Sequence, residues 1–405
     1  MNILFATLVD VNSFGERGIY QDLMRELAGP GHNVYVVSPA ERRYNRPTEF
    51  FSDEAGGILK VRVGNIQKTG KLEKGVSTVL LESQYVGAVK KHLKGIKFDL
   101  VIYSTPPITL GKLIRYVKRR DNAVTYLLLK DIFPQNAVDL GFLSQGSLLY
   151  RFFRKKERML YAMSDFIGCM SPANVMYLLE HNREVDGSAV HVCPNSITQV
   201  APADGADKVE IRKRYGIPQD VKVFAYGGNL GKPQCVSFIV SCLRLAQDKG
   251  DRFFLICGEG TDAQLLSDYV REELPGNVKL FDMLPMEEYG ELLSACDIGL
   301  IFLDYRFTIP NFPSRLLSYM AQGLPVLACT DRATDLGDII AGGGFGWWCW
   351  SGEPEAFDRI ADEICGMGGD ALREMGKRGR KYLEENYLAS QAAGVILESV
   401  GRASS

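Results

Sequence analysis

VKVFAYGGNLGKPQ, residues 221–234, shows how the chain is organised. Its first six residues, 221–226, form an apolar strand pattern that runs into a loop with three glycines, Asn229 and Lys232. Similar short apolar runs recur on both sides of this stretch and are separated by helical patterns. Strands that are apolar on both faces are typical of a parallel sheet covered by helices on both sides.

The strand patterns fall into two series. The first series comprises 2–8, 33–38, 98–103, 123–129, 165–170 and 189–193, and the second comprises 221–226, 252–257, 277–281, 297–303 and 324–329. A turn-rich linker near 195–207 separates them, and a long helical pattern covers 371–401. Two such series in 405 residues predict two doubly wound α/β domains. We place them at 1–197 and 198–385, and expect a last helix, 386–405, to pack back on the first domain.

Composition and charge restrict the class of protein. Nine cysteines without a C-x-x-C pair indicate neither a disulfide framework nor a zinc site. Met1 leads directly into a strand pattern, and no run approaches the ~18 apolar residues that span a bilayer, so we expect a cytoplasmic chain. Residues 1–200 hold 26 Lys and Arg against 19 Asp and Glu, whereas 201–405 hold 21 against 30. The basic half favours an anionic membrane surface or another polyanion, and a solvated basic face is the alternative.

In open α/β sheets, ligands bind beyond the carboxyl ends of the strands, so the loops at these ends are candidate sites. The loop 226–234 combines Gly228, Asn229 and Lys232, and its flexible backbone and cation suit a diphosphate. In the GEG loop at 258–260, Glu259 either accepts hydrogen bonds from a nucleoside or sugar or is a solvated turn residue.

Two further segments carry weaker signals for an anion. Gly15 and Gly18 lie in a strand-to-helix turn, where backbone N–H groups can approach a ligand, although a plain tight turn also fits. NFPSRLLSYMAQGLPVL, residues 311–327, predicts a helix that begins near Ser314 and Arg315. Arg315 in a first helical turn opposes the helix dipole unless an anion binds there, while an ordinary surface arginine is the alternative.

Together, these motifs resemble glycosyltransferase family 4, the retaining transferases of GT-B fold that use sugar nucleotides, in the branch that builds bacterial surface polysaccharides. The resemblance covers essentially the whole chain and rests on GIYQDLMRELAGPGHNVYVVSP, LKDIFPQNAVDLGFL, YGGNLGKPQ, GEG and PSRLLSYMAQGLPV. It implies two Rossmann-like domains with a cleft, of which the second holds the nucleotide diphosphate and the first the acceptor.

The resemblance also assigns residues. Asn229 and Lys232 match the positions that grip the diphosphate, and Ser314 and Arg315 match a helical anion site. Gly15 and Gly18 match the glycine loop beside the transferred sugar. Members of the family generally need no metal, so we expect no metal or other cofactor. We expect UDP rather than GDP as the donor nucleotide, although the sequence identifies neither base nor sugar, and we expect no nucleic-acid partner.

The sequence departs from the family pattern at one motif. Members commonly carry two glutamates eight positions apart around this helix, and here those positions are Pro310 and Ser318. Ser318 could still contact the donor ribose, but without the bidentate grip of a carboxylate. Asp304 and Arg306 are candidates to replace the first glutamate at the transferred sugar.

Asp131 follows the strand pattern 123–129 and is our candidate for engaging the acceptor hydroxyl or a donor sugar hydroxyl. Its alternative role is to cap the helix that follows. In a retaining front-face reaction, the departing phosphate itself can take the acceptor proton, so no strong protein base is required.

The segment 148–161 alternates aromatic and apolar residues with basic ones and can rest on an anionic membrane. The basic residues are Arg151, Arg154, Lys155, Lys156 and Arg158. A soluble helix with a basic outer face is the alternative. The family branch implies a saccharide acceptor linked to polyprenyl diphosphate, which favours a peripheral position on the inner membrane face.

The leading interpretation is therefore a hexosyl- or N-acetylhexosaminyl-type transferase that extends a saccharide acceptor. A sugar-nucleotide 2-epimerase on the same fold is a second hypothesis, and it would leave the basic aromatic segment without a role. A non-catalytic sugar-nucleotide-binding partner is a third, because the glutamate pair is missing.

Overall fold

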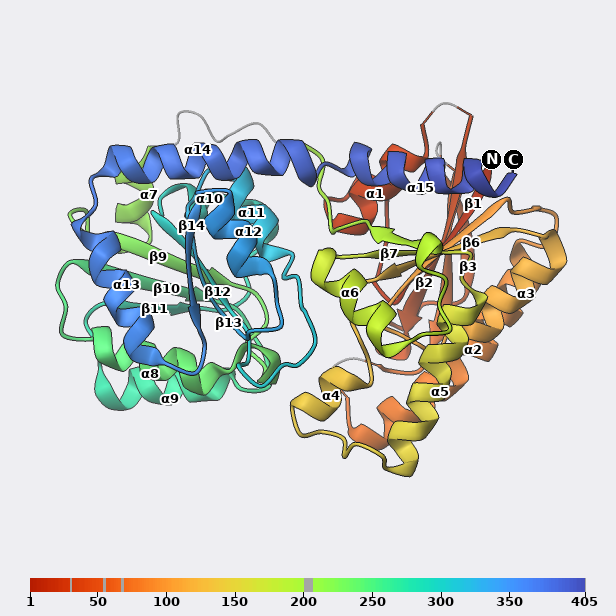
Figure 1. The fold of residues 1–405 in the computed structure, drawn as a ribbon, viewed down its shortest axis with the longest axis horizontal. Coiled ribbons are helices and arrows are strands. Elements are labelled where there is room, and N and C mark those ends of the chain that lie inside the picture. The colour runs from red at the N-terminus through yellow and green to blue at the C-terminus, as the bar shows by residue number, and fades with distance from the viewer. Residues whose placement is uncertain (30, 54–55, 67–68, 200–206, 405) are drawn as a thin grey trace. The chain divides into compact units, whose positions relative to one another are not determined.

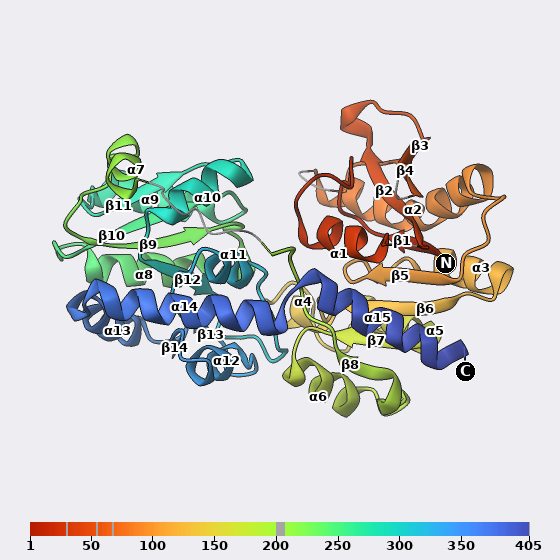
Figure 2. The ribbon, with the colours of Figure 1, turned by 90° about the horizontal axis from the view of Figure 1, so that it is seen from above.

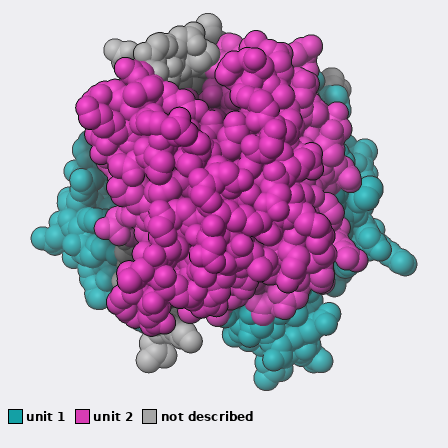
Figure 3. Space-filling model, turned by 90° about the vertical axis from the view of Figure 1, so that its left-hand side faces the viewer, with its two compact units in different colours: residues 1–198, 388–405 teal, residues 199–387 magenta. Residues whose placement is uncertain are grey.

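A computed structural model of the chain describes residues 1–29, 31–53, 56–66, 69–199 and 207–404. The chain divides into two compact units, which Figure 3 distinguishes by colour. Unit 1 comprises residues 1–198 and 388–405, and unit 2 comprises residues 199–387. Of the linker expected near 195–207, residues 200–206 lie outside the described residues.

Unit 1 contains an eight-stranded sheet in the order β3-β4-β2-β1-β5-β6-β7-β8, which can be followed in Figure 2. The strands are β1 (Asn2–Ala6), β2 (Asn33–Glu41), β3 (Glu49–Asp53), β4 (Gly56–Val63), β5 (Leu100–Ser104), β6 (Val124–Leu129), β7 (Phe166–Cys169) and β8 (Val190–Val192). All neighbours pair in parallel except β3, which pairs with β4 in the antiparallel sense.

Helices cover both faces of this sheet (Figure 1). They are α1 (Ile19–Leu27), α2 (Lys71–His92), α3 (Gly111–Asp121), α4 (Gln135–Asp139), α5 (Leu148–Met163), α6 (Pro172–His181) and α15 (Ala389–Ser404), with short 3-10 turns η1 (Arg42–Tyr44) and η2 (Gly187–Ala189). Ile3 and Phe5 of β1 face α1 and α15, whereas Leu4 and Ala6 face α2 and α3. This alternation on a fully buried strand produces the near-continuous apolar run at 2–8.

Unit 2 contains a six-stranded parallel sheet in the order β11-β10-β9-β12-β13-β14. The strands are β9 (Lys222–Gly227), β10 (Arg252–Cys257), β11 (Val278–Phe281), β12 (Ile298–Phe302), β13 (Val326–Thr330) and β14 (Gly346–Trp350). The helices are α7 (Lys208–Arg214), α8 (Val236–Ala246), α9 (Ala263–Glu273), α10 (Met286–Ser294), α11 (Arg315–Ala321), α12 (Leu336–Gly342), α13 (Pro354–Gly366) and α14 (Gly369–Asn386), with the 3-10 turn η3 (Lys232–Gln234). The doubly wound α/β class expected from the sequence is confirmed.

The C-terminal helical segment differs in detail from the sequence pattern. The helical pattern at 371–401 forms two helices, α14 and α15, which are interrupted at Tyr387 and Leu388. Helix α15 packs against α1 in unit 1, and the amide of Ala389 donates to the carbonyl of Ile197 (2.9 Å). The last helix therefore returns to the first unit.

Three strands escaped the sequence analysis, namely β3, β4 and β14. The apolar pattern is interrupted in β3, which reads EFFSD, and in β4, which carries the charged residues Lys60 and Arg62, whereas β14 reads GWWCW and its apolar run was simply overlooked. Lys60 is buried and forms an ion pair with Asp10 from the loop after β1. A partner distant in sequence thus allows a lysine inside a strand, which no local pattern reveals.

Candidate functional site

In unit 2, the loops after β9 and β10 lie backbone against backbone. Gly228, whose φ is 123°, donates its N–H to the carbonyl of Cys257 (2.9 Å). A Cβ atom at Gly258 would lie 1.9 Å from the carbonyl oxygen of Gly228, and one at Gly260 would lie 2.3 Å from that of Leu230. The GEG glycines are therefore required by close packing of the two loops, and Glu259 between them has an exposed side chain.

Side chains fix the shape of the glycine loop after β9. Tyr226 donates its hydroxyl to the carbonyl of Asn229 (2.6 Å), and the Asn229 amide donates to Gln234 Oε1 (2.7 Å). Asn229 thus braces the loop in this structure. Lys232 has a half-exposed side chain, and its Nζ lies 3.5 Å from Asp262 Oδ2. Lys232 is therefore the cation of this loop, and it is paired with Asp262 in this structure.

Arg315, the first residue of α11, extends to the end of β9. Its guanidinium carbon lies 4.3 Å from the centroid of the Tyr226 ring, and a Cβ atom at Gly228 would lie 3.3 Å from Nη2. The Nη1 atom is buried and has no hydrogen-bond partner among the described residues. The alternative of an ordinary surface arginine is therefore wrong.

The groups around this guanidinium are neutral. Burial raises the pKa of Tyr226, of Tyr289 and of Tyr319, the last to about 12, so all three stay protonated near pH 7. In the described part of the chain, no carboxylate forms an ion pair with Arg315. A buried cation without a counter-ion at a strand's carboxyl end is suited to bind an anionic ligand.

The other predicted residues on or near α11 are arranged differently. Ser314 is exposed, has helical backbone angles and makes no side-chain cap hydrogen bond. Ser318 is also exposed, whereas Pro310 is buried. Leu316, Leu317 and Met320 are fully buried and supply the packing of the helix. Arg315 is therefore the residue of this segment with a clear electrostatic reason to bind a ligand.

Asp304 and Arg306, the candidates for the missing glutamate, pair with each other. Asp304 is buried, and its carboxylate accepts from Arg306 Nε (2.8 Å) and Nη2 (2.6 Å). The amide of Asp304 donates to the carbonyl of Pro233 (2.9 Å), which ties this loop to η3. The Arg306 side chain is 41% exposed, so it is the member of the pair that can reach a ligand.

Asp331, after β13, was missed by the sequence analysis. It is fully buried, and its carboxylate accepts from the amides of Ala333 (2.9 Å) and Thr334 (2.8 Å) and from the Thr334 hydroxyl (3.0 Å). That hydroxyl in turn accepts from the amide of Asn311 (3.0 Å). Asp331 therefore positions the segment before α11, and its burial raises its pKa to about 6.

In unit 1, polar residues gather at the carboxyl ends of β5 and β6. The hydroxyl oxygen of Thr105 accepts from the amides of Lys130 (3.0 Å) and Asp131 (3.1 Å). Both carboxylate oxygens of Asp131 accept from the Asn136 side-chain amide (2.8 Å each). Helix α4 begins after Pro134 without a side-chain cap, so the alternative role of Asp131 as a helix cap is wrong.

Lys130 is a second ionisable group that the sequence analysis missed. Its Nζ donates to Asn195 Oδ1 and lies 4.6 Å from the centroid of the Tyr20 ring. Burial lowers the pKa of Lys130 to about 7 and raises that of Asp131 to about 6. Burial therefore moves the pKa values of both groups toward neutrality, and the Asp131 carboxylate accepts hydrogen bonds from Asn136.

The first glycine loop lies between β1 and α1. The Gly15 amide donates to Ser13 Oγ (3.0 Å), and the Gly18 amide contacts Asp22 Oδ1 at 3.4 Å. Arg25 Nη1 donates to two loop carbonyls, including that of Phe14 (2.6 Å). The N–H groups of both glycines thus have partners within unit 1, and the loop is braced from α1.

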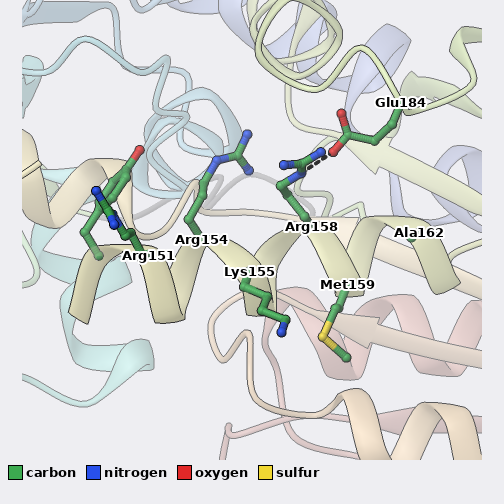
Figure 4. Close-up of a pocket in the computed structure, with 8 residues that line it drawn as sticks. Arg151, Arg154, Lys155, Arg158, Met159, Ala162 and Glu184 are labelled. Atoms are coloured by element: carbon green, nitrogen blue, oxygen red, sulfur yellow. Dashed lines mark hydrogen bonds and ion pairs between the residues drawn. The ribbon is translucent and has the colours of Figure 1, made fainter. Parts of the chain in front are cut away.

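Helix α5 carries the basic segment and borders a cavity of about 470 Å³ (Figure 4). Arg154 is paired with Glu157 (2.7 Å) and Arg158 with Glu184 (2.5 Å), whereas Lys156 lies 3.8 Å from Glu82. Arg151 and Lys155 also line this cavity, and both are exposed. Three large apolar side chains at the start of the helix are exposed: Leu148, Leu149 and Phe152.

The described residues contain neither a helix that could span a membrane nor a cluster that could hold a metal ion. Every helix is either too short or too polar to cross a bilayer. No three His, Cys, Asp or Glu side chains are grouped to hold a metal ion.

Two parallel-sheet Rossmann-like units in one chain, with a last helix that returns to the first unit, define the GT-B fold. The solved structure of HepE from Anabaena in complex with UDP-glucose has the same fold, with a TM-score of 0.70, 15% identity, and coverage of 99% of this chain and 100% of that chain.

Sequence comparisons agree with this class. Residues 207–382 match the family described as Glycosyl transferases group 1. The probable glycosyltransferase WbjE from Pseudomonas aeruginosa is 26% identical over 323 residues, 79% of this chain and 78% of that protein. The putative colanic acid biosynthesis glycosyl transferase WcaI from Escherichia coli is 21% identical over 247 residues, 60% of each chain. The fold and the sequence comparisons together support the assignment of this chain as a glycosyltransferase.

Proposed function

We propose that this protein is a retaining glycosyltransferase of family 4 that needs no metal ion and moves a sugar from a nucleotide diphosphate sugar to a saccharide acceptor in bacterial surface polysaccharide biosynthesis. The transferred group is a hexosyl or N-acetylhexosaminyl unit. The observation that carries the proposal is Arg315, a buried guanidinium that lies at the glycine loop after β9 without a counter-ion among the described residues.

On this proposal, the donor diphosphate binds at the carboxyl end of β9. The Arg315 guanidinium donates to one phosphate, and Lys232, on a half-exposed side chain, neutralises the other. These two cations stabilise the leaving diphosphate, which is the role that a divalent metal has in other transferases. HepE was solved with UDP-glucose, which supports UDP over GDP as the donor nucleotide.

The acceptor binds to unit 1, with Asp131 as the group that orients its hydroxyl. The carboxylate is held by Asn136 and lies at the end of β6. Before the reaction it accepts a hydrogen bond from the acceptor hydroxyl; as the bond between the sugar and the diphosphate breaks, that proton passes to the departing phosphate oxygen in a front-face reaction. Gly15 and Gly18 lie beside the transferred sugar, and Arg306 is the remaining candidate for a polar contact with it.

We further propose that the acceptor is carried on polyprenyl diphosphate, and that α5 rests on the inner face of the cytoplasmic membrane. The exposed side chains of Leu148, Leu149 and Phe152 supply apolar contacts, and those of Arg151 and Lys155 attract anionic lipid headgroups. The name of WcaI, which refers to colanic acid biosynthesis, supports a polysaccharide product.

A thermal-shift panel of UDP, GDP, ADP and their sugars, with and without EDTA, tests the donor assignment. The proposal predicts that UDP and UDP-sugars raise the melting temperature and that EDTA leaves the shift unchanged. A shift that appears only with added Mg²⁺ contradicts the metal-independent site. A sugar nucleotide that is isomerised in the absence of acceptor supports the 2-epimerase instead.

A further inference from the structure

A polar cavity of about 560 Å³ lies in unit 1 between the ends of β2 and β4 and the side of α2. Its lining residues are Arg42, Arg62, Val63, Gly64, Glu73, Ser77, Leu80 and Gln84. A volume of this size is in the range of small-molecule sites, about 300–1,000 Å³. The residues discussed above for the donor and for the acceptor hydroxyl do not line it.

Two arginines and one glutamate are the charged residues that line this cavity. Glu73 Oε1 accepts from Arg42 Nη2 (2.7 Å) and from the Asn65 amide (2.9 Å), and Glu73 Oε2 accepts from the Thr69 hydroxyl (2.6 Å). The Thr69 hydrogen bond is the main cause that lowers the pKa of Glu73, so the carboxylate is ionised and offsets Arg42. Arg62 is exposed and remains as a second cation.

One side chain that lines the cavity, that of Gln84, has a buried oxygen without a hydrogen-bond donor in the described part of the chain. Gln84 Oε1 is buried and accepts no hydrogen bond from any described residue. A buried amide oxygen without a donor costs about 1–3 kcal/mol, and a rotation of the partly exposed Gln84 side chain that brings this oxygen to a ligand hydroxyl would remove the cost. Ser77 beside it is almost completely buried. A Cβ atom at Gly64 would lie 2.2 Å from Ser77 Oγ, so only a glycine allows the chain after β4 to pack this closely against α2.

The cavity lies on the functional edge of the sheet. Strands β4, β2, β1, β5 and β6 are neighbours in that order and run parallel, so their carboxyl ends share one edge. Val63 at the end of β4 lines the cavity, and Asp131 lies just beyond the end of β6. A chain of sugars that has its reacting hydroxyl at Asp131 can therefore extend along this edge to the cavity.

We propose that this cavity is an acceptor subsite that binds one saccharide unit of the acceptor, remote from the unit that receives the new sugar. The proposal rests on the proposed glycosyltransferase function. Gln84 Oε1 and Glu73 accept hydrogen bonds from ring hydroxyls, and Arg62 donates to ring or hydroxyl oxygens. Val63 and Leu80 contact the apolar C–H face of the ring. A mixed set of donors and acceptors that includes an ionised carboxylate fits a polyhydroxylated ring better than a phosphate, which Glu73 would repel.

Binding of the full chain to a printed array of bacterial surface oligosaccharides tests this subsite. The wild type is expected to bind a subset of the printed saccharides. Gln84→Leu, which keeps the size of the side chain, and Arg62→Ala, which truncates an exposed residue, are each expected to weaken this binding at least tenfold. Arg119→Ala is the matched control, because Arg119 is an exposed arginine on α3 of the same unit, and it should bind within twofold of the wild type.

Two results would overturn the subsite. One is a wild type that binds no saccharide on the array, and the other is a pair of variants that bind like the control. The thermal shift with UDP is measured on the same samples and is expected to be equal for all four proteins, because the cavity lies in unit 1 and Arg315 in unit 2. Loss of the UDP shift in the wild type would instead count against the proposed function, so the two failures are distinguishable.

Discussion

Replacing Arg315 with methionine should weaken nucleotide binding and stabilise the ligand-free protein. A hydrogen bond between charged groups contributes about 1.5–3 kcal/mol, so its loss should raise the Kd for UDP about 10- to 150-fold. In the absence of ligand, the buried Nη1 has no described acceptor, and its desolvation costs about 1–3 kcal/mol. The cation–π contact with the Tyr226 ring offsets about 0.5–2 kcal/mol of this desolvation cost. We therefore expect Arg315→Met to increase the free energy of unfolding by about 1 kcal/mol.

Titration calorimetry with UDP and urea denaturation measure the two effects separately. Arg332→Met is the matched control, because the Arg332 guanidinium also lies over an aromatic ring, 4.8 Å from the Trp350 centroid, but its side chain is exposed. The control should keep its UDP affinity within twofold. The reasoning is refuted if Arg315→Met binds UDP as tightly as the wild type, or if it lowers ligand-free stability by more than about 1 kcal/mol.

Three further predictions address the loops, the acceptor side and the membrane. Gly260→Ala places a Cβ 2.3 Å from a carbonyl oxygen of the facing glycine loop and should cost about 1–3 kcal/mol in urea denaturation, whereas Gly250→Ala, with open space around it, should be nearly neutral. Asp131→Asn should lower kcat/KM about 10- to 150-fold, and wild-type activity should fall as the pH drops through about 6, where the carboxylate gains its proton; a flat profile from pH 5 to 8 would exclude this role. Arg151→Ala with Lys155→Ala should weaken sedimentation with phosphatidylglycerol vesicles about 30-fold, at about 1 kcal/mol for each charge, without changing the weak binding to phosphatidylcholine.

The sequence predicted the α/β class because the buried parallel strands carry nearly continuous apolar runs, such as the one at 2–8. It also pointed to the loops after β9 and β10, because glycines that allow close backbone approach leave a visible pattern. It did not reveal β4, where the buried Lys60 depends on Asp10, a partner 50 residues away in the sequence. Local patterns cannot report pairs that only the folded chain brings together.

The same dependence on contacts between distant residues explains why the sequence did not reveal the surroundings of the candidate site residues. In the sequence, Arg315 is notable because a positive side chain in the first turn of a helix opposes the helix dipole. In the structure, its guanidinium lies over the ring of Tyr226 at the end of β9, which the sequence does not predict. Lys130 gave no signal at all, since its lowered pKa arises from burial beside Tyr20 and Asn195. The pairing of Asp304 with Arg306 also depends on a loop conformation that the sequence does not specify.

The basic first half and acidic second half of the chain fit a division of labour between the two units. In unit 1, exposed basic and apolar side chains on α5 suit an anionic surface. In unit 2, acidic residues form surface ion pairs such as Arg214 with Glu291 and Arg244 with Glu273, whereas Arg315 has a buried Nη1 atom without a partner among the described residues. On the proposed function, membrane attraction belongs to unit 1 and donor recognition to unit 2.

The most direct test of the central claim is sugar transfer itself. The wild type and Arg315→Met are incubated with a bacterial membrane lipid extract and a panel of ¹⁴C-labelled UDP-, GDP- and ADP-sugars, with EDTA present. We predict that the wild type moves label from one UDP-sugar into the organic phase, that the anomeric configuration is retained, and that the variant is strongly impaired at the same donor concentration. Label that stays in the aqueous phase for every donor, whether unchanged or isomerised, would contradict the account.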